Sequence, residues 1–346
     1  MILNSEELKN FREKINSYIN DFHFPEEFEY MDFLDKSINS LENESESYRQ
    51  KNLKNFPGGL LDFSDYQKPV IVVPDIHARA EFLTDLLDFN LKNHLGKEIS
   101  VLEALNQNEI KIICVGDGVH SESRGLERWK NAWQDYQNGL YDGKSMREEM
   151  KENISTMMIV MSLKNIFTSD FHFLKGNHEN VLNENFDGNF SFRKFVMEGE
   201  MCFKFFQEVY GDAVLHLISV WEKSLPVFAL FKNFCISHAE PLEVYNRKQI
   251  VNCFQNPNVI EGLTWTPNDA VKKNTCWETF KNLNPNAEKR NFFYLGGHRP
   301  VKEKYNLRQN GTYIQFHNPN QENIAFCIPG KNLNLESDIF SVEEIL

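Results

Sequence analysis

Five short apolar segments, each ending in a cluster of Asp, His, Asn or Gly residues, constrain the fold more than any other feature of this sequence. Runs rich in Val, Ile and Phe that stop at turn-forming residues predict buried β-strands. A fold of packed strands and helices gathers the loops at its strand ends into one site, so we expect the five clusters to meet. The clusters are Asp75-Ile76-His77, Gly116-Asp117-Gly118, Gly176-Asn177-His178-Glu179, His238-Ala239-Glu240 and Gly297-His298.

Six side chains in these clusters are of metal-binding types: Asp75, His77, Asp117, Asn177, His238 and His298. Two carboxylates, three imidazoles and one amide oxygen, with no thiolate, suit Mn, Fe, Zn or Co ions with five or six ligands. Two such ions ~3.5–4 Å apart can share one carboxylate and one hydroxide, which generates a nucleophile near neutral pH and neutralises charge on a phosphoryl group. The donor set therefore predicts phosphoester hydrolysis.

At these residues the sequence resembles the calcineurin-like metallophosphoesterases, and most closely the branch of the phosphoprotein phosphatases and symmetrical diadenosine tetraphosphate hydrolases. The signatures of that family are Asp-x-His, Gly-Asp-x-x-Asp-Arg-Gly, Gly-Asn-His-Glu, a His at a strand end and Gly-His. All five junctions occur in the family's order between residues 68 and 327. The resemblance implies an α+β fold, the family's four-layer α/β/β/α sandwich. It also implies a hydrolase of phosphoric esters, with a phosphomonoesterase of the phosphoprotein phosphatase type as the leading analogy.

The resemblance also implies a role for each matching residue. Asp75 and His77 would hold a first metal ion, and Asp117 would bridge it to a second. The second ion would be completed by Asn177, His238 and His298. His178 would be the general acid that protonates the leaving oxygen. The cofactors implied are two divalent or trivalent transition metal ions, Mn, Fe or Zn.

The second motif departs from the family pattern. Where the family has an Asp that orients the catalytic His, followed by an Arg, this chain has His120 and Ser121. Glu122 or Arg124 would supply those roles if the loop is remodelled. His120 itself is either a contact to metal or phosphate, with a part in catalysis, or a residue outside that contact shell.

Three arginines near the motifs are candidate phosphate ligands, because a guanidinium can bind phosphate with two parallel hydrogen bonds. They are Arg79, Arg124 and Arg299, and ordinary salt bridges are the alternative interpretation of each. The substrate would be a phosphoprotein or a small phosphoester, and a dinucleoside polyphosphate hydrolase is the alternative enzyme. The altered second motif also leaves open a degenerate, non-catalytic phosphate-binding module, although all six candidate ligands are retained.

Outside the motifs, the pattern of apolar residues predicts the organisation of the chain. Residues 1–67 are expected to form a helical N-terminal extension that ends in a loop at Phe56-Pro57-Gly58-Gly59. Residues 68–346 would form the metallophosphoesterase domain, with a helical insertion near residues 126–166. A Phe-rich helix is expected over residues 190–210. The segments 311–316 and 323–328 look like a closing hairpin.

Composition limits the remaining possibilities. The 37 basic and 50 acidic residues give a net charge of −13, which makes nucleic acid an improbable partner. The six cysteines include no Cys-x-x-Cys pair, so neither a thiolate zinc site nor a dithiol redox centre is expected. The chain begins with an acidic segment and has no window of ~18 apolar residues. We therefore expect a soluble cytoplasmic protein without a membrane partner.

Overall fold

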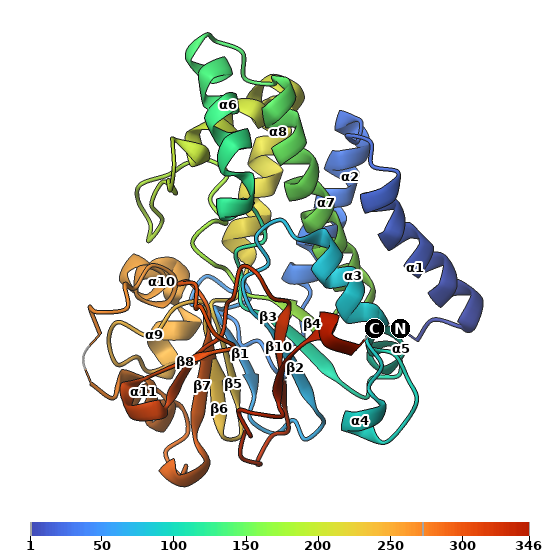
Figure 1. Cartoon of the computed structure of the whole chain (residues 1–346). Coiled ribbons are helices and arrows are strands. Elements are labelled where there is room, and N and C mark those ends of the chain that lie inside the picture. Colours follow the sequence, from blue (N-terminus) through green and yellow to red (C-terminus); the bar gives the residue numbers. More distant parts are fainter. Residues whose placement is uncertain (1, 272, 346) are drawn as a thin grey trace.

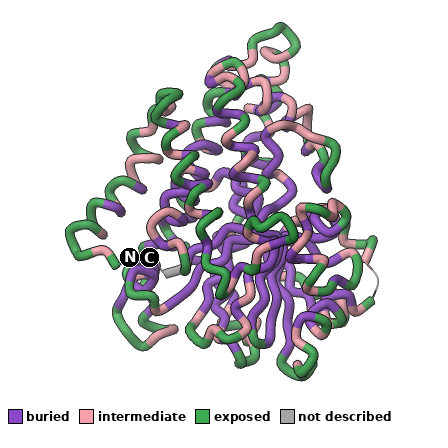
Figure 2. The backbone as a smooth tube through the Cα atoms, turned by 180° about the vertical axis from the view of Figure 1, so that it is seen from behind, coloured by how far each residue is buried: buried purple, intermediate pink, exposed green. Residues whose placement is uncertain are grey.

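Two mixed β-sheets are stacked face to face, and helices cover the outer side of each sheet (Figure 1). The computed structural model describes residues 2–271 and 273–345. This arrangement confirms the expected four-layer α/β/β/α sandwich. Figure 2 shows that most of the strand residues are buried, whereas exposed residues concentrate in the outer helices and loops. The edge strand β8 is the exception, since two of its three residues are exposed.

The five-stranded sheet has the order β11-β10-β2-β3-β4. Its neighbouring strands β2, β3 and β4 run parallel to one another, so their carboxyl ends lie at the same edge. Strand β10 runs antiparallel to β2 and to β11. The bounds are β2 (Val70–Val73), β3 (Lys111–Cys114), β4 (Phe171–Phe173), β10 (Asn323–Cys327) and β11 (Ile339–Ser341).

The six-stranded sheet has the order β1-β5-β6-β7-β9-β8. Strands β6, β7 and β9 are parallel, which places two further carboxyl ends, those of β6 and β7, side by side. The bounds are β1 (Leu60–Phe63), β5 (Phe228–Phe231), β6 (Phe234–Ile236), β7 (Phe293–Gly296), β8 (Asn306–Arg308) and β9 (Tyr313–Gln315).

Alternate residues of the central strands face two different apolar cores. Val70 and Val72 belong to the core between the sheets, whereas Ile71 and Val73 face the helices that cover the five-stranded sheet. Because both faces of the sheet are buried, the strand is a continuous apolar run without polar alternation. This is why the sequence pattern identified it.

Helices α1 to α8 lie on the outer side of the five-stranded sheet, where α1, α2 and α6 pack on other helices. Helices α9 to α11 pack on the other sheet (Figure 1). The first group is α1 (Ser5–Asn20), α2 (Glu27–Glu42), α3 (Ala80–Asp88), α4 (Lys92–Leu95), α5 (Val101–Asn106), α6 (Leu126–Gln137), α7 (Lys144–Ile166) and α8 (Glu198–Ser224). The second group is α9 (Arg247–Val251), α10 (Pro257–Thr264) and α11 (Thr275–Leu283). The helices expected over residues 126–166 are thus α6 and α7.

The N-terminal extension begins as expected and ends differently. Asn4 caps α1 through a capping box with Glu7, in which each side chain accepts a hydrogen bond from the backbone of the other residue. Helices α1 and α2 pack against α7, and α2 also packs against α8. The sequence interpretation missed β1, however, which lies within the first 67 residues and pairs in parallel with β5. A four-residue strand at a sheet edge has too short a period-two pattern to be recognised.

Two other expectations are corrected. The predicted closing hairpin is wrong, because β9 belongs to the six-stranded sheet and β10 to the five-stranded sheet. The antiparallel neighbours are instead β8 with β9 and β10 with β11. The Phe-rich helix begins at Glu198, so residues 190–197 form a loop. None of the helices in the described ranges is both long enough and apolar enough to span a bilayer.

Candidate metal centre

All five predicted clusters follow the carboxyl ends of parallel strands, namely β2, β3, β4, β6 and β7. Parallel strands present their carboxyl ends at one edge, and the two sheets bring their edges together. The six candidate ligands are consequently within one site, although Asp75 and His298 are 223 positions apart in the chain.

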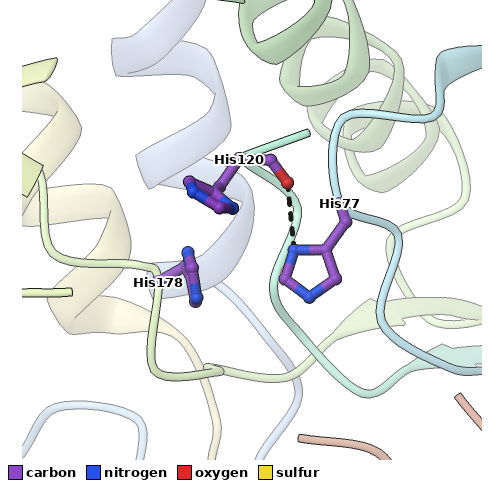
Figure 3. A group of neighbouring side chains, drawn as sticks. All are labelled: His77, His120 and His178. Carbon is purple, nitrogen blue, oxygen red and sulfur yellow. Dashed lines mark hydrogen bonds between the residues drawn. The ribbon is translucent and has the colours of Figure 1, made fainter. Parts of the chain in front are cut away.

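The first group of ligands is formed by Asp75, His77 and Asp117. The His77 ring directs Nδ1 toward the backbone carbonyls of Val119 and His120, at 3.2 and 3.1 Å. Figure 3 shows the bond to His120. Its Nε2 faces the carboxylates, 3.8 Å from Asp75 Oδ2 and 3.7 Å from Asp117 Oδ2. A backbone contact at Nδ1 fixes the ring orientation and leaves Nε2 as the donor atom for a cation.

The second group is formed by Asn177, His238 and His298 around the amide oxygen of Asn177. This Oδ1 lies 2.9 Å from His238 Nε2 and 2.8 Å from His298 Nδ1. His238 Nδ1 contacts the backbone carbonyl of Val115 at 3.2 Å, and its Nε2 is 3.4 Å from Asp117 Oδ2. Asp117 Oδ2 therefore lies beside both groups, where the sequence predicts the bridging carboxylate.

The spacing of these atoms fits two cations. Donor atoms ~2.1 Å from a shared ion lie about 3–4 Å apart, and the separations of 2.8 to 3.8 Å agree with that value. The donor chemistry and the spacing are both compatible with a pair of metal ions.

The electrostatics of the site point in the same direction. Burial, together with the neighbouring carboxylates Asp117 and Glu122, raises the pKa of Asp75 well above its usual range. Burial also raises the pKa of Asp117 to about 7. The pKa of His77 and of His298 is lowered, chiefly by burial, which keeps both rings in the neutral form that binds metal. Three buried carboxylates in contact are costly unless cations balance their charge.

The backbone at the site is strained. His77, Asp117 and His298 have positive φ angles of 49°, 52° and 66°. Residues with side chains seldom adopt this conformation, and it persists where tertiary contacts impose it.

His178, the predicted general acid, lies at the edge of the centre. Its backbone N–H donates to Asp117 Oδ1 at 2.9 Å, and its Nε2 is 3.8 Å from Asp117 Oδ2. The ring stacks on Phe192 with centroids 4.6 Å apart, and burial lowers its pKa well below the usual range. Its Nδ1 is buried and has no partner among the described side chains. His178 is therefore a neutral imidazole placed beside the carboxylate of Asp117.

His120 is also part of the centre (Figure 3). Its ring nitrogen lies within 4.8 Å of those of His77 and His178. The Nδ1 atom accepts a hydrogen bond from the backbone N–H of Glu122 at 3.2 Å, and Nε2 is 3.7 Å from Glu198 Oε1. These contacts hold the His120 ring beside His178. A direct contact to metal or phosphate stays a prediction.

The expectation that Glu122 or Arg124 replaces the missing Asp and Arg of the second motif is not supported by their contacts. Glu122 Oε2 instead contacts His317 Nε2 at 3.1 Å, and its Oε1 is 3.7 Å from His77 Nε2. Arg124 pairs with Glu152 and points one nitrogen toward the backbone carbonyl of His77 at 3.2 Å.

The other two predicted arginines occupy different positions. Arg79 donates to the backbone carbonyls of Asp75, Ile76 and Gln321 at 2.9, 3.0 and 3.1 Å, which occupies most of its guanidinium. Arg299 is exposed and lines the cavity that contains the metal-binding residues. Phosphate binding by any of the three arginines stays a prediction, and the position of Arg299 favours it most.

Sequence reasoning missed several residues of this cavity, which measures about 150 Å³. Phe192, Arg193 and Lys194 come from the loop before α8, and Trp265 follows α10. None of them belongs to a motif, so no sequence signal marked them. His317 was also missed, although it follows a predicted strand directly. Such a position was the signal that identified the other histidines.

Comparison with solved structures supports the fold. A protein serine/threonine phosphatase from Saccharomyces cerevisiae, with similarity to the human phosphatase PP5, aligns with a TM-score of 0.56 and 12% sequence identity. The alignment covers 95% of this chain and 94% of that one. This likeness confirms the four-layer sandwich fold expected from the motifs.

Two more distant structures are also similar. A candidate diadenosine tetraphosphatase aligns with a TM-score of 0.42 and 14% identity over 82% of this chain and 97% of that one. The cold-active protein-tyrosine phosphatase of a psychrophilic Shewanella species aligns with a TM-score of 0.46 and 12% identity, over 86% and 85%. No protein-family model and no curated protein sequence matches the chain.

Proposed function

We propose that this protein is a metal-dependent phosphoester hydrolase, with a phosphomonoesterase of the phosphoprotein phosphatase type as the leading candidate. The observation that carries the proposal is the position of Asp117. Its Oδ2 lies 3.7 Å from His77 Nε2 and 3.4 Å from His238 Nε2, between two groups of donor atoms. One carboxylate shared by two ligand sets is the arrangement that hydrolysis with two ions requires.

The donor set suits Mn, Fe or Zn, because it combines carboxylate and amide oxygens with imidazole nitrogens. Asp75 and His77 would hold one ion, and Asn177, His238 and His298 the other, with Asp117 between them. When bound, the two ions lower the pKa of water and neutralise charge on the phosphoryl group.

The surrounding residues bind the ester and move a proton. His178 would protonate the leaving oxygen, since it lies 3.8 Å from Asp117 Oδ2 and opens into the cavity. A general acid must carry its proton at the working pH, and a substrate phosphate beside the ring would favour the protonated form. Arg299 and Arg193 place positive charge on the cavity wall and would attract the anionic ester.

One observation favours a small aromatic phosphoester, such as a dinucleoside polyphosphate, as the second candidate substrate. Phe192 and Trp265 line the same cavity as the metal-binding residues. Aromatic rings stack on nucleobases at ~1–3 kcal/mol per base. A phosphopeptide would use the arginines of the wall but would have no base to stack on these rings.

The first prediction follows from the proposed role of His178. Replacing His178 with Asn should lower kcat by roughly 100-fold or more, because a general acid contributes about 10²–10⁴ to the rate. Metal content should stay at two ions per chain, as measured by elemental analysis. Exposed His216 on α8 provides the matched control, and H216N should retain both activity and metal.

The substrate panel should contain p-nitrophenyl phosphate, its bis ester, a phosphopeptide and a dinucleoside tetraphosphate, each with added Mn. We expect the monoesters to be cleaved faster than the bis ester. A preference for the dinucleoside tetraphosphate would establish the second candidate. A chain that binds two ions and phosphate but cleaves none of the four would be a degenerate binding module, and a chain that binds no metal would refute the proposal.

A further inference from the structure

We propose that His317 is an additional protein ligand of the metal ion held by Asp75 and His77, and that Glu122 orients its ring. This inference rests on the proposed function, since it requires a metal ion at that position. The inference goes beyond the proposed function because it adds His317 to the set of metal ligands. This histidine lies outside the five motifs that predicted the other ligands.

The position of His317 places it in the centre. It follows β9 by two residues, on the sheet edge where β6 and β7 also end, and its side chain is completely buried. Its ring centroid is 5.1 Å from that of His77. Asp75, His77 and His317 can each offer one donor atom such that all three lie within 4.8 Å of one another.

The contacts of Glu122 determine which nitrogen of His317 is available. Lys194 Nζ lies 2.9 Å from Glu122 Oε1 and favours the ionised carboxylate. An ionised carboxylate only accepts hydrogen bonds, so His317 Nε2, at 3.1 Å from Glu122 Oε2, carries the hydrogen. The lone pair of a neutral ring then resides on Nδ1.

This Nδ1 atom is buried and has no hydrogen-bond partner within the described part of the chain. Leaving a buried polar atom unpaired costs about 1–3 kcal/mol, so an occupant of this position would be favoured. A carboxylate that accepts a hydrogen bond from the far nitrogen of a histidine is the usual support of a metal-binding imidazole. Glu122 has both oxygens engaged, by Lys194 and His317, and therefore acts as the positioning residue.

The altered second motif and His317 are parts of one structural change. His120 and Glu122 have positive φ angles of 76° and 52°, so the loop after Asp117 turns twice. The Glu122 carboxylate of this loop contacts His317 Nε2 at 3.1 Å. The loop that carries the altered motif thus also supplies the carboxylate that would orient His317.

The experiment measures metal binding. Metal-free protein is titrated with Mn and with Co, and the visible absorption of bound Co reports the number and type of ligands. Wild type should bind two ions. E122Q should weaken the binding of one ion by roughly 10–100-fold. H317N should weaken the same ion at least as much, with an altered Co spectrum, and retain the other. H216N should match wild type.

The outcomes separate this inference from the proposed function. Wild type that binds no ions would refute the proposed function itself. Wild type that binds two ions, together with an H317N protein of unchanged affinities and Co spectrum, would overturn only the role of His317. Circular dichroism checks that H317N is folded; if it is not, E122Q decides, and unchanged binding by E122Q then overturns the proposal.

Discussion

At the candidate metal centre, the backbone of Gly297 packs directly against the carboxylate of Asp75. A Cβ atom at this position would lie 1.7 Å from Asp75 Oδ1, far inside van der Waals contact. The same carboxylate accepts the backbone N–H of His298 at 2.9 Å. The residue before His298 must therefore lack a side chain, which gives the Gly-His motif a physical reason.

Replacing Gly297 with Ala should displace Asp75 and remove the first ion. We expect elemental analysis to find about one ion fewer per chain than in wild type, because Asp75 cannot keep its position. The matched control is G139A, whose added methyl group meets no atom within 4 Å but occupies a residue with φ of 79°. G139A should lose stability through backbone strain yet keep both ions. Full metal content in G297A would contradict this interpretation.

At the scale of elements, a buried ion network ties the N-terminal helices to the sandwich. Glu44, just after α2, pairs with Lys164 of α7 and with Arg49, and its Oε1 is 3.0 Å from His172 Nδ1 on β4. Arg49 also donates to the backbone carbonyl of Gly58 at 2.8 Å. The side chains of Glu44 and Arg49 are fully buried. One carboxylate thus connects the end of α2 to α7 and to the edge strand β4.

Neutralising Glu44 should destabilise the fold strongly. E44Q leaves Lys164 and Arg49 buried without a counter-charge, and breaking a buried pair in this way costs about 3–5 kcal/mol of unfolding free energy. The neighbouring Glu46 pairs with Lys51 at 2.9 Å with both side chains exposed, so E46Q should cost roughly 0–1 kcal/mol. Denaturant unfolding of both variants tests this contrast, and equal losses would show that the network is not important for stability.

At the scale of the whole molecule, the buried His172 should make stability depend on pH. Burial, together with nearby Lys164, lowers its pKa to about 3. The unfolded chain binds a proton at an ordinary histidine pKa of about 6.5. Between these two values the unfolded state therefore binds more protons than the folded state, and stability decreases as the pH falls.

The titration of His172 alone changes the free energy of unfolding by at most about 1.4 kcal/mol per pH unit. Other groups also titrate, so the measurement compares wild type with H172Q, which has no imidazole to protonate. From pH 7 to about 4.5, wild type should lose roughly 2–3 kcal/mol more unfolding free energy than H172Q. Parallel pH profiles for the two proteins would exclude His172 as a source of acid sensitivity.

Much of the fold and the site could be predicted from the sequence, because the relevant signals are local. Strands buried on both faces are continuous apolar runs, as in Val70 to Val73. Glycines stand where a side chain would collide, and ligand residues follow directly after the strands. These features identified the sandwich fold and six metal-binding candidates that the structure brings together.

Other features depend on contacts between distant parts of the chain and left no local signal. The strand β1 is defined by its pairing with β5, 168 positions away at Leu60 and Phe228. Whether β9 pairs with β10 was decided by which sheet each strand joins. The orientation of Glu122 toward His317, 195 positions later, likewise follows from the turn of its loop.

The sequence by itself thus determined which residue types stand at which strand ends, since burial and turn geometry act over a few residues. Only the tertiary structure decided which of those ends face one another and which loops line the cavity. The physical reason is that a site is assembled from side chains whose separation in the chain bears no relation to their distance in space. In the folded protein Glu122 contacts both Lys194 and His317, yet none of the three residues is a neighbour of another in the sequence.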